Sequence, residues 1–183
     1  MNALPEKLIA SLKKLDHFDE SAFREVHASG KQVVSVRFNP AKMQLKAGNW
    51  PLPFPDAAFQ PGDRIPWSCD GYYLAERPSF TLDPLFHAGV YYVQEASGMF
   101  LEQALRHAVD LSRPVKVLDL CAAPGGKSTL IQSLISKDSV LVSNEVIRTR
   151  VPVLHQQLDK WGSFNGIISN NDPKDFKQLP GFF

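Results

Sequence analysis

The segment from Val115 to Thr129 constrains the fold of this chain more than any other stretch. Val115 to Leu120 is a mostly apolar run with β-branched residues at alternate positions, which is typical of a strand buried on both faces of a parallel sheet. Small residues, a Pro and two Gly follow, and apolar residues then recur at helical spacing, at Leu130, Ile131, Leu134 and Ile135. The segment therefore predicts a strand, a tight loop and a helix.

The predicted loop, Cys121 to Gly126, lies at the carboxyl end of a strand, where open parallel sheets bind ligands. Gly125 and Gly126 allow the backbone to approach a ligand, and the following helix start presents unpaired N–H groups to an anion. A phosphate-binding loop, G-x-x-x-x-G-K-[ST], would need Gly at position 121, and the dinucleotide pattern G-x-G-x-x-G is also absent. What remains is a strand-end acid, Asp119, and a loop that can wrap an amino-acid carboxylate, as binding of S-adenosylmethionine in a Rossmann-like sheet requires.

The string from Asp119 to Thr129, Asp-Leu-Cys-Ala-Ala-Pro-Gly-Gly-Lys-Ser-Thr, resembles the cofactor motif of the Nol/Nop/Sun family of S-adenosylmethionine-dependent RNA cytosine-5 methyltransferases. Gly89 to Ser97 is similar to the segment that precedes this motif, and Ser35 to Pro40 resembles the family's N-terminal R-x-N strand. Glu76 to Phe80 fits the bacterial branch that modifies ribosomal RNA. The resemblance covers nearly the whole chain. It implies a class I methyltransferase fold, S-adenosylmethionine as cofactor and RNA, above all ribosomal RNA, as partner.

Composition places the chain among soluble globular proteins, with 44% hydrophobic and 21% charged residues. The N-terminus carries charges where a secretory signal has its apolar core, and no apolar run reaches the ~18 residues of a membrane span, so we expect a cytoplasmic protein. Cys69 and Cys121 suggest no disulfide framework, and the five histidines lack metal-ligand spacing, so we expect no metal. The net charge of +1 argues neither for nor against a nucleic-acid partner.

The patterning predicts an α/β protein in which a small α+β module, residues 1–88, precedes an incomplete Rossmann-like domain, residues 89–183. Asp19 or Ser21 is the expected cap of the second helix, and Gly30 its end. The expected helices lie at about 8–15, 19–28, 96–109, 126–135 and 151–161, and the expected strands at 32–38, 90–94, 115–120, 139–143 and 166–169. Short connections between the last strands and helices imply a parallel sheet with right-handed crossovers.

The segment from Gly48 to Pro84 is rich in Pro and aromatic residues, so it cannot form a regular helix, because each Pro removes a donor and fixes φ. Its aromatic side chains, Trp50 and Trp67 among them, either stack on unpaired RNA bases or pack onto the neighbouring domain. Packing is the expectation for any single one of them.

Two acids that follow later strands are candidates for binding the rest of the cofactor. Glu145 follows the second strand near the ~20-residue offset at which an acid meets ribose hydroxyls in this architecture, and the resemblance implies that role. Asp172 follows the third strand, where the resembled family carries an acid or amide that binds the adenine amino group. Asn171 is its possible substitute, and a simple turn is the alternative, since Asn, Asp and Pro all favour turns.

Charged residues complete the predicted site. Lys127 lies at a helix start, a place unfavourable for a cation unless a carboxylate binds there. Arg150 either contacts the ribose, pairs with Glu145 or is solvated, and Cys121 is interpreted as a loop residue with backbone contacts rather than as a nucleophile. The predicted cofactor-binding residues are Cys121, Ala122, Ala123, Pro124, Gly125, Gly126, Lys127, Glu145, Arg150 and Asp172.

The sequence departs from the family in lacking both later cysteine motifs, one of them Asp-Ala-Pro-Cys-like. In that family a cysteine thiolate adds to C6 of cytosine, so that C5 can take the methyl group. No catalytic residue is therefore assigned within this chain, and the nucleophile is expected beyond Phe183. We expect the first part of a longer enzyme, which binds cofactor weakly and is inactive alone.

The segment Leu179 to Phe183 falls where a fourth strand of such a sheet would be starting. Loss of that strand would expose the edge of Val115 to Leu120, so we also expect marginal stability or self-association. A non-catalytic RNA-binding protein and a P-loop-like nucleotide hydrolase remain the alternatives.

Overall fold

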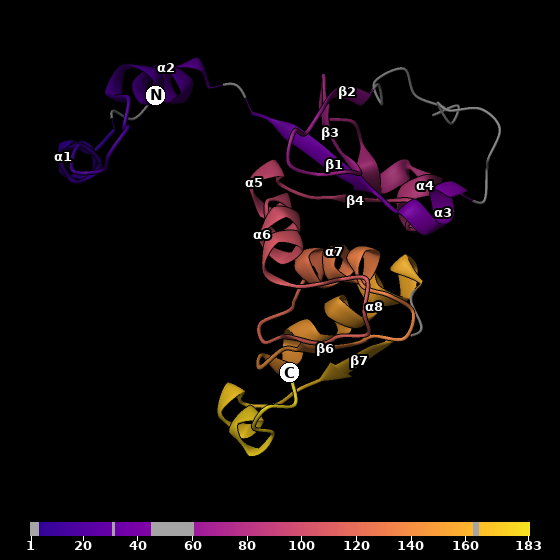
Figure 1. The fold of residues 1–183 in the computed structure, drawn as a ribbon. Helices are drawn as coiled ribbons and strands as arrows, with labels where there is room; N and C mark the ends of the chain where they lie inside the picture. The colour runs from indigo at the N-terminus through magenta and orange to yellow at the C-terminus, as the bar shows by residue number, and fades with distance from the viewer. Residues whose placement is uncertain (1–3, 31, 45–60, 163–164) are drawn as a thin grey trace. The chain divides into compact units, whose positions relative to one another are not determined.

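The computed structural model describes residues 4–30, 32–44, 61–162 and 165–183, and the chain divides into two compact units, residues 1–33 and 34–183 (Figure 1). The expected division at residues 88 and 89 stays a prediction. Trp50 and its aromatic neighbours up to Phe59 lie outside the described residues, so both interpretations of that segment remain open there.

The first unit holds two helices, α1 (Glu6–Leu12) and α2 (Glu20–Ser29). Asp19 caps α2, because its side chain accepts a hydrogen bond from the N–H of Ala22 at 2.9 Å. Gly30 ends the helix with a left-handed φ of 61°, which favours Gly. The structure thus selects Asp19 from the two candidate caps and confirms the predicted end of the helix.

The second unit begins with an antiparallel sheet in the order β2-β3-β1-β4. Its strands are β1 (Val34–Phe38), β2 (Pro61–Arg64), β3 (Gly71–Leu74) and β4 (Tyr91–Val93). All five side chains of β1 are buried, because the strand lies inside the sheet and pairs Val36 with Tyr72 on one side and with Val93 on the other. Between these strands lie three short helical segments, α3 (Pro40–Gln44), η1 (Phe80–Leu82) and α4 (Pro84–His87).

Two short helices, α5 (Ala96–Met99) and α6 (Leu101–Ala108), follow the first sheet where the sequence predicts a single helix. The break falls at Phe100, which is 57% exposed, whereas Met99 beside it is completely buried. Gly98 weakens the helix just before this point, because Gly is a poor helix former.

A parallel sheet in the order β5-β6-β7 forms the rest of the unit, as predicted. Its strands are β5 (Lys116–Asp119), β6 (Val140–Asn144) and β7 (Gly166–Ser169), and its helical segments are α7 (Gly126–Leu134), η2 (Arg148–Arg150), α8 (Val151–Trp161) and η3 (Pro173–Gln178). Helices α7 and α8 lie on one face of this sheet (Figure 1). Leu141 of β6 packs there against Ile131 and Ile135.

The expectation that the strand at Val115 to Leu120 is buried on both faces is wrong. Lys116 is exposed, and the other residues of β5 are only partly buried. The physical reason is the place of β5 at the edge of the described sheet, where α7 covers one face and β6 supplies the only strand partner in the described residues.

The segment Leu179 to Phe183 contains a turn after η3 and does not enter the parallel sheet, so the start of a fourth strand is not seen there. The turn includes Gly181, whose φ of +69° favours Gly, and the preceding Pro180 cannot donate a ladder hydrogen bond. These two residues explain why the segment is not extended.

The first sheet contacts helix α8, which packs on the second sheet, just before β4 begins. Gly89 adopts a φ of +66°, and a Cβ there would lie 2.0 Å from the carbonyl oxygen of Lys160 on α8. Only Gly therefore allows the backbone to come this close. The buried Asn39 donates from Nδ2 to the carbonyl oxygen of Trp161 at 2.9 Å, so β1 is tied to the end of α8.

None of the described helices combines the length and apolar character needed to cross a bilayer. Within the same residues, no group of three or more His, Cys, Asp and Glu side chains is arranged to hold a metal ion.

Candidate cofactor site

One buried side chain holds the carboxyl ends of all three parallel strands together. Asn144, at the end of β6, donates from Nδ2 to the carbonyl oxygens of Leu120 after β5 and of Asn171 after β7, at 3.1 and 3.0 Å. Its Oδ1 accepts from Ser169 Oγ and from the N–H of Asn171, each at 2.9 Å. The edge on which ligands are expected to bind is therefore one connected rim.

The loop Cys121 to Gly126 is fixed to this rim by its own backbone. The N–H of Ala122 donates to the carbonyl oxygen of Asn144 at 2.8 Å, and the N–H of Ala123 donates to Oε2 of Glu145 at 3.2 Å. The methyl groups of both alanines are buried against Leu154 and Leu158 of α8. The Ala123–Pro124 peptide bond is cis. The small side chains predicted for this loop thus serve its packing against α8.

The loop passes into α7 at Gly125. This residue has a φ of +115°, which strains any residue with a Cβ, and a Cβ there would lie 3.2 Å from Cβ of Gln157. Gly125 also supplies no side-chain cap, so the first N–H groups of α7 lack a side-chain acceptor at this position. An uncapped helix start is suited to binding an anionic group of a ligand.

Glu145 joins the loop to the segment after β6. Its side chain is 2% exposed, Oε1 accepts from the N–H of Ile147 at 2.9 Å, and Oε2 accepts from Ala123. Arg150 approaches the same Oε2 to 3.5 Å with Nη1 and donates to the carbonyl oxygen of Ala123 with Nη2. Of the three interpretations open for Arg150, the structure shows the pair with Glu145. Both carboxylate oxygens of Glu145 thus accept from backbone N–H groups, and its role toward a ribose stays a prediction.

The other predicted residues lie at the same rim with fewer contacts. Cys121 and Lys127 are exposed. Asp172 is exposed as well and caps η3, since its Oδ1 accepts from the N–H of Lys174 at 2.9 Å. The turn that the sequence offered as an alternative for Asp172 is therefore present. The second carboxylate oxygen, Oδ2, takes no part in this capping bond.

Phe183 is the residue after which we expect the nucleophile. It lies outside the cofactor loop, Cys121 to Gly126. Its side chain is 40% exposed, and its ring lies 4.9 Å from that of Phe182. Phe183 also lines an apolar groove beside Lys116 and Val117 of β5. It is thus a packing residue, and the place of the nucleophile stays a prediction.

Sequence reasoning named Asp119 but missed the buried polar residues behind the loop, Ser128, Ser143 and Asn144. Asp119 accepts from Ser128 Oγ at 2.7 Å, and Ser128 accepts in turn from Ser143 Oγ at 3.0 Å. These serines and Asn144 are buried, so they hold the site rather than face a ligand. The only sequence signal was a polar residue at the end of an apolar strand, which also marks an ordinary strand end.

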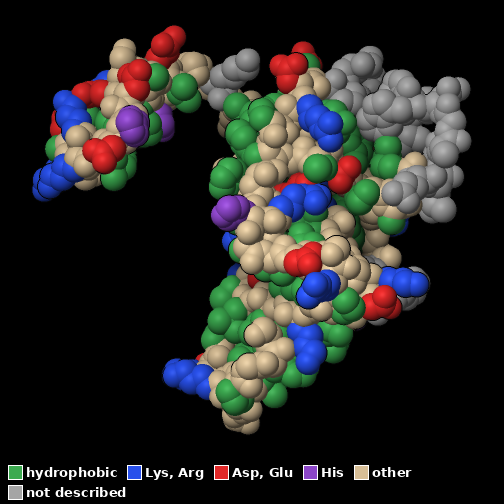
Figure 2. All heavy atoms as spheres, viewed as in Figure 1, with side chains coloured by type: hydrophobic (Ala, Val, Ile, Leu, Met, Phe, Trp, Pro, Cys, Tyr) green, Lys and Arg blue, Asp and Glu red, His purple; other side chains and the backbone are tan. Residues whose placement is uncertain are grey.

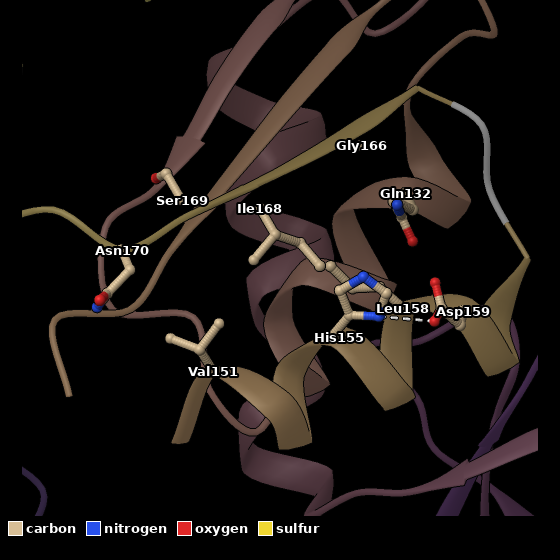
Figure 3. A pocket seen from close by; sticks show the side chains of 9 residues that line it. All are labelled: Gln132, Val151, His155, Leu158, Asp159, Gly166, Ile168, Ser169 and Asn170. Atoms are coloured by element: carbon tan, nitrogen blue, oxygen red, sulfur yellow. Dashed lines mark ion pairs between the residues drawn. The ribbon is translucent and has the colours of Figure 1, made fainter. Parts of the chain in front are cut away.

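A groove of about 460 Å³ lies between α8 and β7 (Figure 3). Leu158 and Ile168 give it an apolar part, and His155 and Asp159, one turn apart on α8, pair at 2.7 Å. Gln132 reaches it from α7, and its buried Oε1 has no hydrogen-bond partner in the described part of the chain. None of the ten predicted cofactor residues lines this groove, so it is a feature apart from the loop.

Charges are mixed over the face of the molecule shown in Figure 2. Lys and Arg side chains are scattered there with Asp and Glu side chains among them, rather than gathered in one patch. This distribution agrees with the formal net charge of +1, and charge alone gives no direction for an RNA partner.

A parallel sheet with helices packed on one face and a loop at its carboxyl edge is the architecture of Rossmann-like folds, the class to which many methyltransferases belong. A methyltransferase homolog from Pyrococcus horikoshii has a similar structure, with 28% identity and a TM-score of 0.63 over 87% of this chain and 51% of that one. The protein PH0851 is 20% identical, with a TM-score of 0.75 over 97% of this chain and 38% of its own, and supports the fold alone.

Two sequence profiles then identify the family. The N-terminal domain of 16S rRNA methyltransferase RsmF matches residues 4–96, and 16S rRNA methyltransferase RsmB/F matches residues 107–183. The chain therefore belongs to the RsmF family of 16S rRNA methyltransferases, and the resemblance seen in its motifs is confirmed.

Curated relatives carry the name ribosomal RNA small subunit methyltransferase F. That of Shewanella woodyi is 36% identical over 151 residues, which cover 78% of this chain and 30% of the relative. That of Vibrio atlanticus is 30% identical in an alignment 189 positions long, gaps included, which covers 94% of this chain and 36% of the relative. The chain thus spans about a third of the length of these relatives.

Proposed function

We propose that this chain supplies the S-adenosylmethionine-binding part of an enzyme that methylates C5 of a cytosine in ribosomal RNA. The observation that carries the proposal is the loop Cys121 to Gly126, whose backbone is held by buried Glu145 and by Arg150 at the carboxyl edge of a parallel sheet. Ribosomal RNA as the substrate agrees with the cytoplasmic location expected from the sequence.

Each part of the cofactor has a proposed partner in this chain. The loop and the exposed Lys127 bind the amino-acid part, since the uncapped start of α7 favours a carboxylate. Glu145 accepts from the ribose hydroxyls, and Asp172 or Asn171 binds the adenine amino group. When bound, S-adenosylmethionine supplies the methyl group.

Neither cysteine of this sequence is proposed as the nucleophile. Cys69 and Cys121 do not lie in a Pro-Cys motif, and Cys121 belongs to the loop that binds the cofactor. The chain by itself is therefore proposed to bind the cofactor without transferring the methyl group. A nucleotide hydrolase built on Gly126, Lys127 and Ser128 is the second candidate, and position 121 argues against it because a phosphate-binding loop needs Gly there.

Calorimetric titration of the chain with S-adenosylmethionine, and with magnesium-ATP for comparison, tests the proposal. Gly126 is the position to vary, because a Cβ there meets no atom closer than 3.4 Å. Gly126→Asp places a carboxylate where the cofactor carboxylate is expected, and Gly126→Asn has the same shape without the charge.

Saturable binding of S-adenosylmethionine, weakened at least tenfold more by Asp than by Asn, is the expected result. Binding of magnesium-ATP in its place would favour the hydrolase. Binding of neither ligand would count against a cofactor site in this chain. Equal effects of Gly126→Asp and Gly126→Asn would mean that the cofactor carboxylate does not bind at the start of α7.

A further inference from the structure

A buried arginine of the first sheet reaches the helix that starts at the cofactor loop. Arg37 lies on β1 and is 1% exposed. Burial lowers its pKa to about 9, whereas Asp70, Tyr92 and Glu102 act to raise it, so the guanidinium remains charged at neutral pH. Burial of a charge is unfavourable unless hydrogen bonds and neighbouring groups compensate it.

Most hydrogen bonds of Arg37 go to the first turns of α7, and its guanidinium also lies over the ring of Trp161 at the end of α8, 4.4 Å from the ring centroid. Nη2 donates to Thr129 Oγ1 at 2.6 Å and approaches the carbonyl oxygen of Gly126 at 3.5 Å. Nη1 donates to Ser133 Oγ at 3.2 Å and to the carbonyl oxygen of Thr129 at 3.4 Å. On the side of its own sheet, Nε donates to Gln94 Oε1 at 2.9 Å. One side chain therefore bridges the first sheet and the helix of the cofactor loop.

Thr129 extends this contact back to the loop. Its hydroxyl, which accepts from Arg37, donates to the carbonyl oxygen of Gly126 at 3.2 Å. Gly126 is both the last residue of the loop and the first residue of α7. A cation near a helix start opposes the helix dipole, so its place beside this turn is not explained by the helix itself.

Two residues that follow Arg37 in the chain, Asn39 after β1 and Lys42 on α3, contact a different helix. Asn39 donates to the carbonyl oxygens of Trp161 and Gly89, and Lys42 donates from Nζ to the carbonyl oxygen of Lys160. The bonds to Trp161 and Lys160 hold the end of α8, the bond to Gly89 stays beside β4, and none of the three reaches α7. Asn39 is therefore a natural comparison for Arg37, because both are buried polar residues of one strand and its end.

We propose that Arg37 is a positioning residue of the cofactor site, which holds the first turn of α7 through Thr129 and Gly126 and thereby fixes the loop against the amino-acid part of the cofactor. The proposal rests on the proposed function for the identity of the ligand. The physical coupling between β1 and the loop is independent of that identity.

Hydrogen exchange of the chain without ligand tests the coupling. Arg37→Lys keeps the charge but not the guanidinium geometry, and Thr129→Val keeps the shape and burial but removes the hydroxyl. In both variants we expect the amides of residues 129–133 to exchange at least tenfold faster, while those of β6 keep their rates. Asn39→Ala is the control and should leave residues 129–133 unchanged. The proposal would be overturned if Asn39→Ala accelerated exchange at residues 129–133 as much as the other two variants do. It would also be overturned if neither Arg37→Lys nor Thr129→Val changed these rates.

Titration with two cofactor analogues tests the consequence for binding. S-adenosylhomocysteine carries the amino-acid part, and 5′-methylthioadenosine has the same nucleoside and sulfur without it. Arg37→Lys and Thr129→Val should each weaken the binding of S-adenosylhomocysteine at least tenfold. They should weaken the binding of 5′-methylthioadenosine less than threefold. A general loss of structure would weaken both equally and would contradict the proposal. If the unchanged chain binds neither analogue, the proposed function fails, and the exchange rates alone decide the role of Arg37.

Discussion

Glu145 shows at the scale of one residue what a sequence pattern can and cannot reveal. Its place after the second strand predicts an acid at the cofactor site, and it does lie at the rim. Its bonds to the N–H groups of Ala123 and Ile147 leave no trace in the sequence, because they depend on how two loops approach each other. The same holds for Asn144 and Arg37, polar residues of mostly apolar strands whose partners lie far along the chain.

Replacement of Glu145 by Gln separates the two tasks of this side chain. The amide keeps one oxygen acceptor, so one of the two backbone bonds can persist, but the charge that favours ribose hydroxyls is lost. We expect binding of S-adenosylmethionine to weaken about 10- to 100-fold, the equivalent of about 1.5–3 kcal/mol. Calorimetry measures the change, with Glu25→Gln on α2 as the control. An unchanged affinity would mean that Glu145 does not bind the ribose.

Glu102, on α6, makes stability depend on pH. Burial raises the pKa of this carboxyl, but hydrogen bonds from Cys69, Arg106 and Ser68 outweigh that effect, so the pKa is lowered in the folded chain. In the unfolded chain it returns to about 4.3. The stabilisation is therefore complete above that pH and is lost as the pH falls through the lower, folded value.

At pH 7 the free energy of unfolding of Glu102→Gln should be about 1–3 kcal/mol lower than that of the unchanged chain, because part of a buried set of hydrogen bonds is lost. Its stability should also fall less steeply on acidification than that of the unchanged chain. Urea unfolding at several pH values gives both quantities. The exposed Glu95→Gln is the matched control, and identical pH profiles for the unchanged chain and Glu102→Gln would contradict the assignment.

At the scale of elements, the sequence predicts best where one pattern decides the outcome. The bounds of α8 and β7 agree with the helical spacing and the apolar run that predict them. The burial of β5 was predicted wrongly, because an apolar run reports what a strand can bury and not how many neighbours cover it. The helix predicted from Ala96 to Val109 is divided at Phe100, near Gly98, because apolar spacing does not register a poor helix former within the run.

The cap of α2 provides a test at this scale. Asp19→Ala removes the acceptor for the N–H of Ala22 and should cost about 0.5–2 kcal/mol of helix stability. Faster hydrogen exchange of the amides in α2 would show the loss. Ser21→Ala is the matched control, because Ser21 is the candidate that the structure does not select. Equal effects of the two substitutions would mean that Asp19 is not the cap.

At the scale of the whole molecule, the two sheets of the second unit are joined through contacts that no local pattern predicts. The bond from Arg37 to Thr129 spans 92 residues of sequence, and the close approach of Gly89 to Lys160 depends on the absence of a single Cβ. Such contacts belong to the tertiary fold, so the sequence predicts the sheets separately but not how they meet.

Self-association is the prediction that concerns the molecule as a whole. A mostly apolar groove of about 490 Å³ runs along β5, with Phe183 at one wall and Val109, which is 38% exposed, at another. A free strand edge beside an apolar surface favours association, and β5 pairs on one side alone within the described residues. We expect concentration-dependent association in sedimentation velocity, reduced by Val109→Lys.

The control for this prediction is Val153→Lys, at a valine that is 43% exposed on α8 and lies outside the groove. It adds the same charge to the chain but should not reduce the association. A single monomeric species at all concentrations would refute the prediction.

The side chain of Asn144 has a consequence for how proteins of this architecture can be recombined. Because it bonds to the backbone beyond β5 and beyond β7, the three connecting loops share one support. A single loop transplanted from a relative would not preserve the hydrogen bonds to Asn144 on which the positions of the other two loops depend. Exchange of all three loops as a set, with Asn144 retained, is the form in which a graft should preserve the fold.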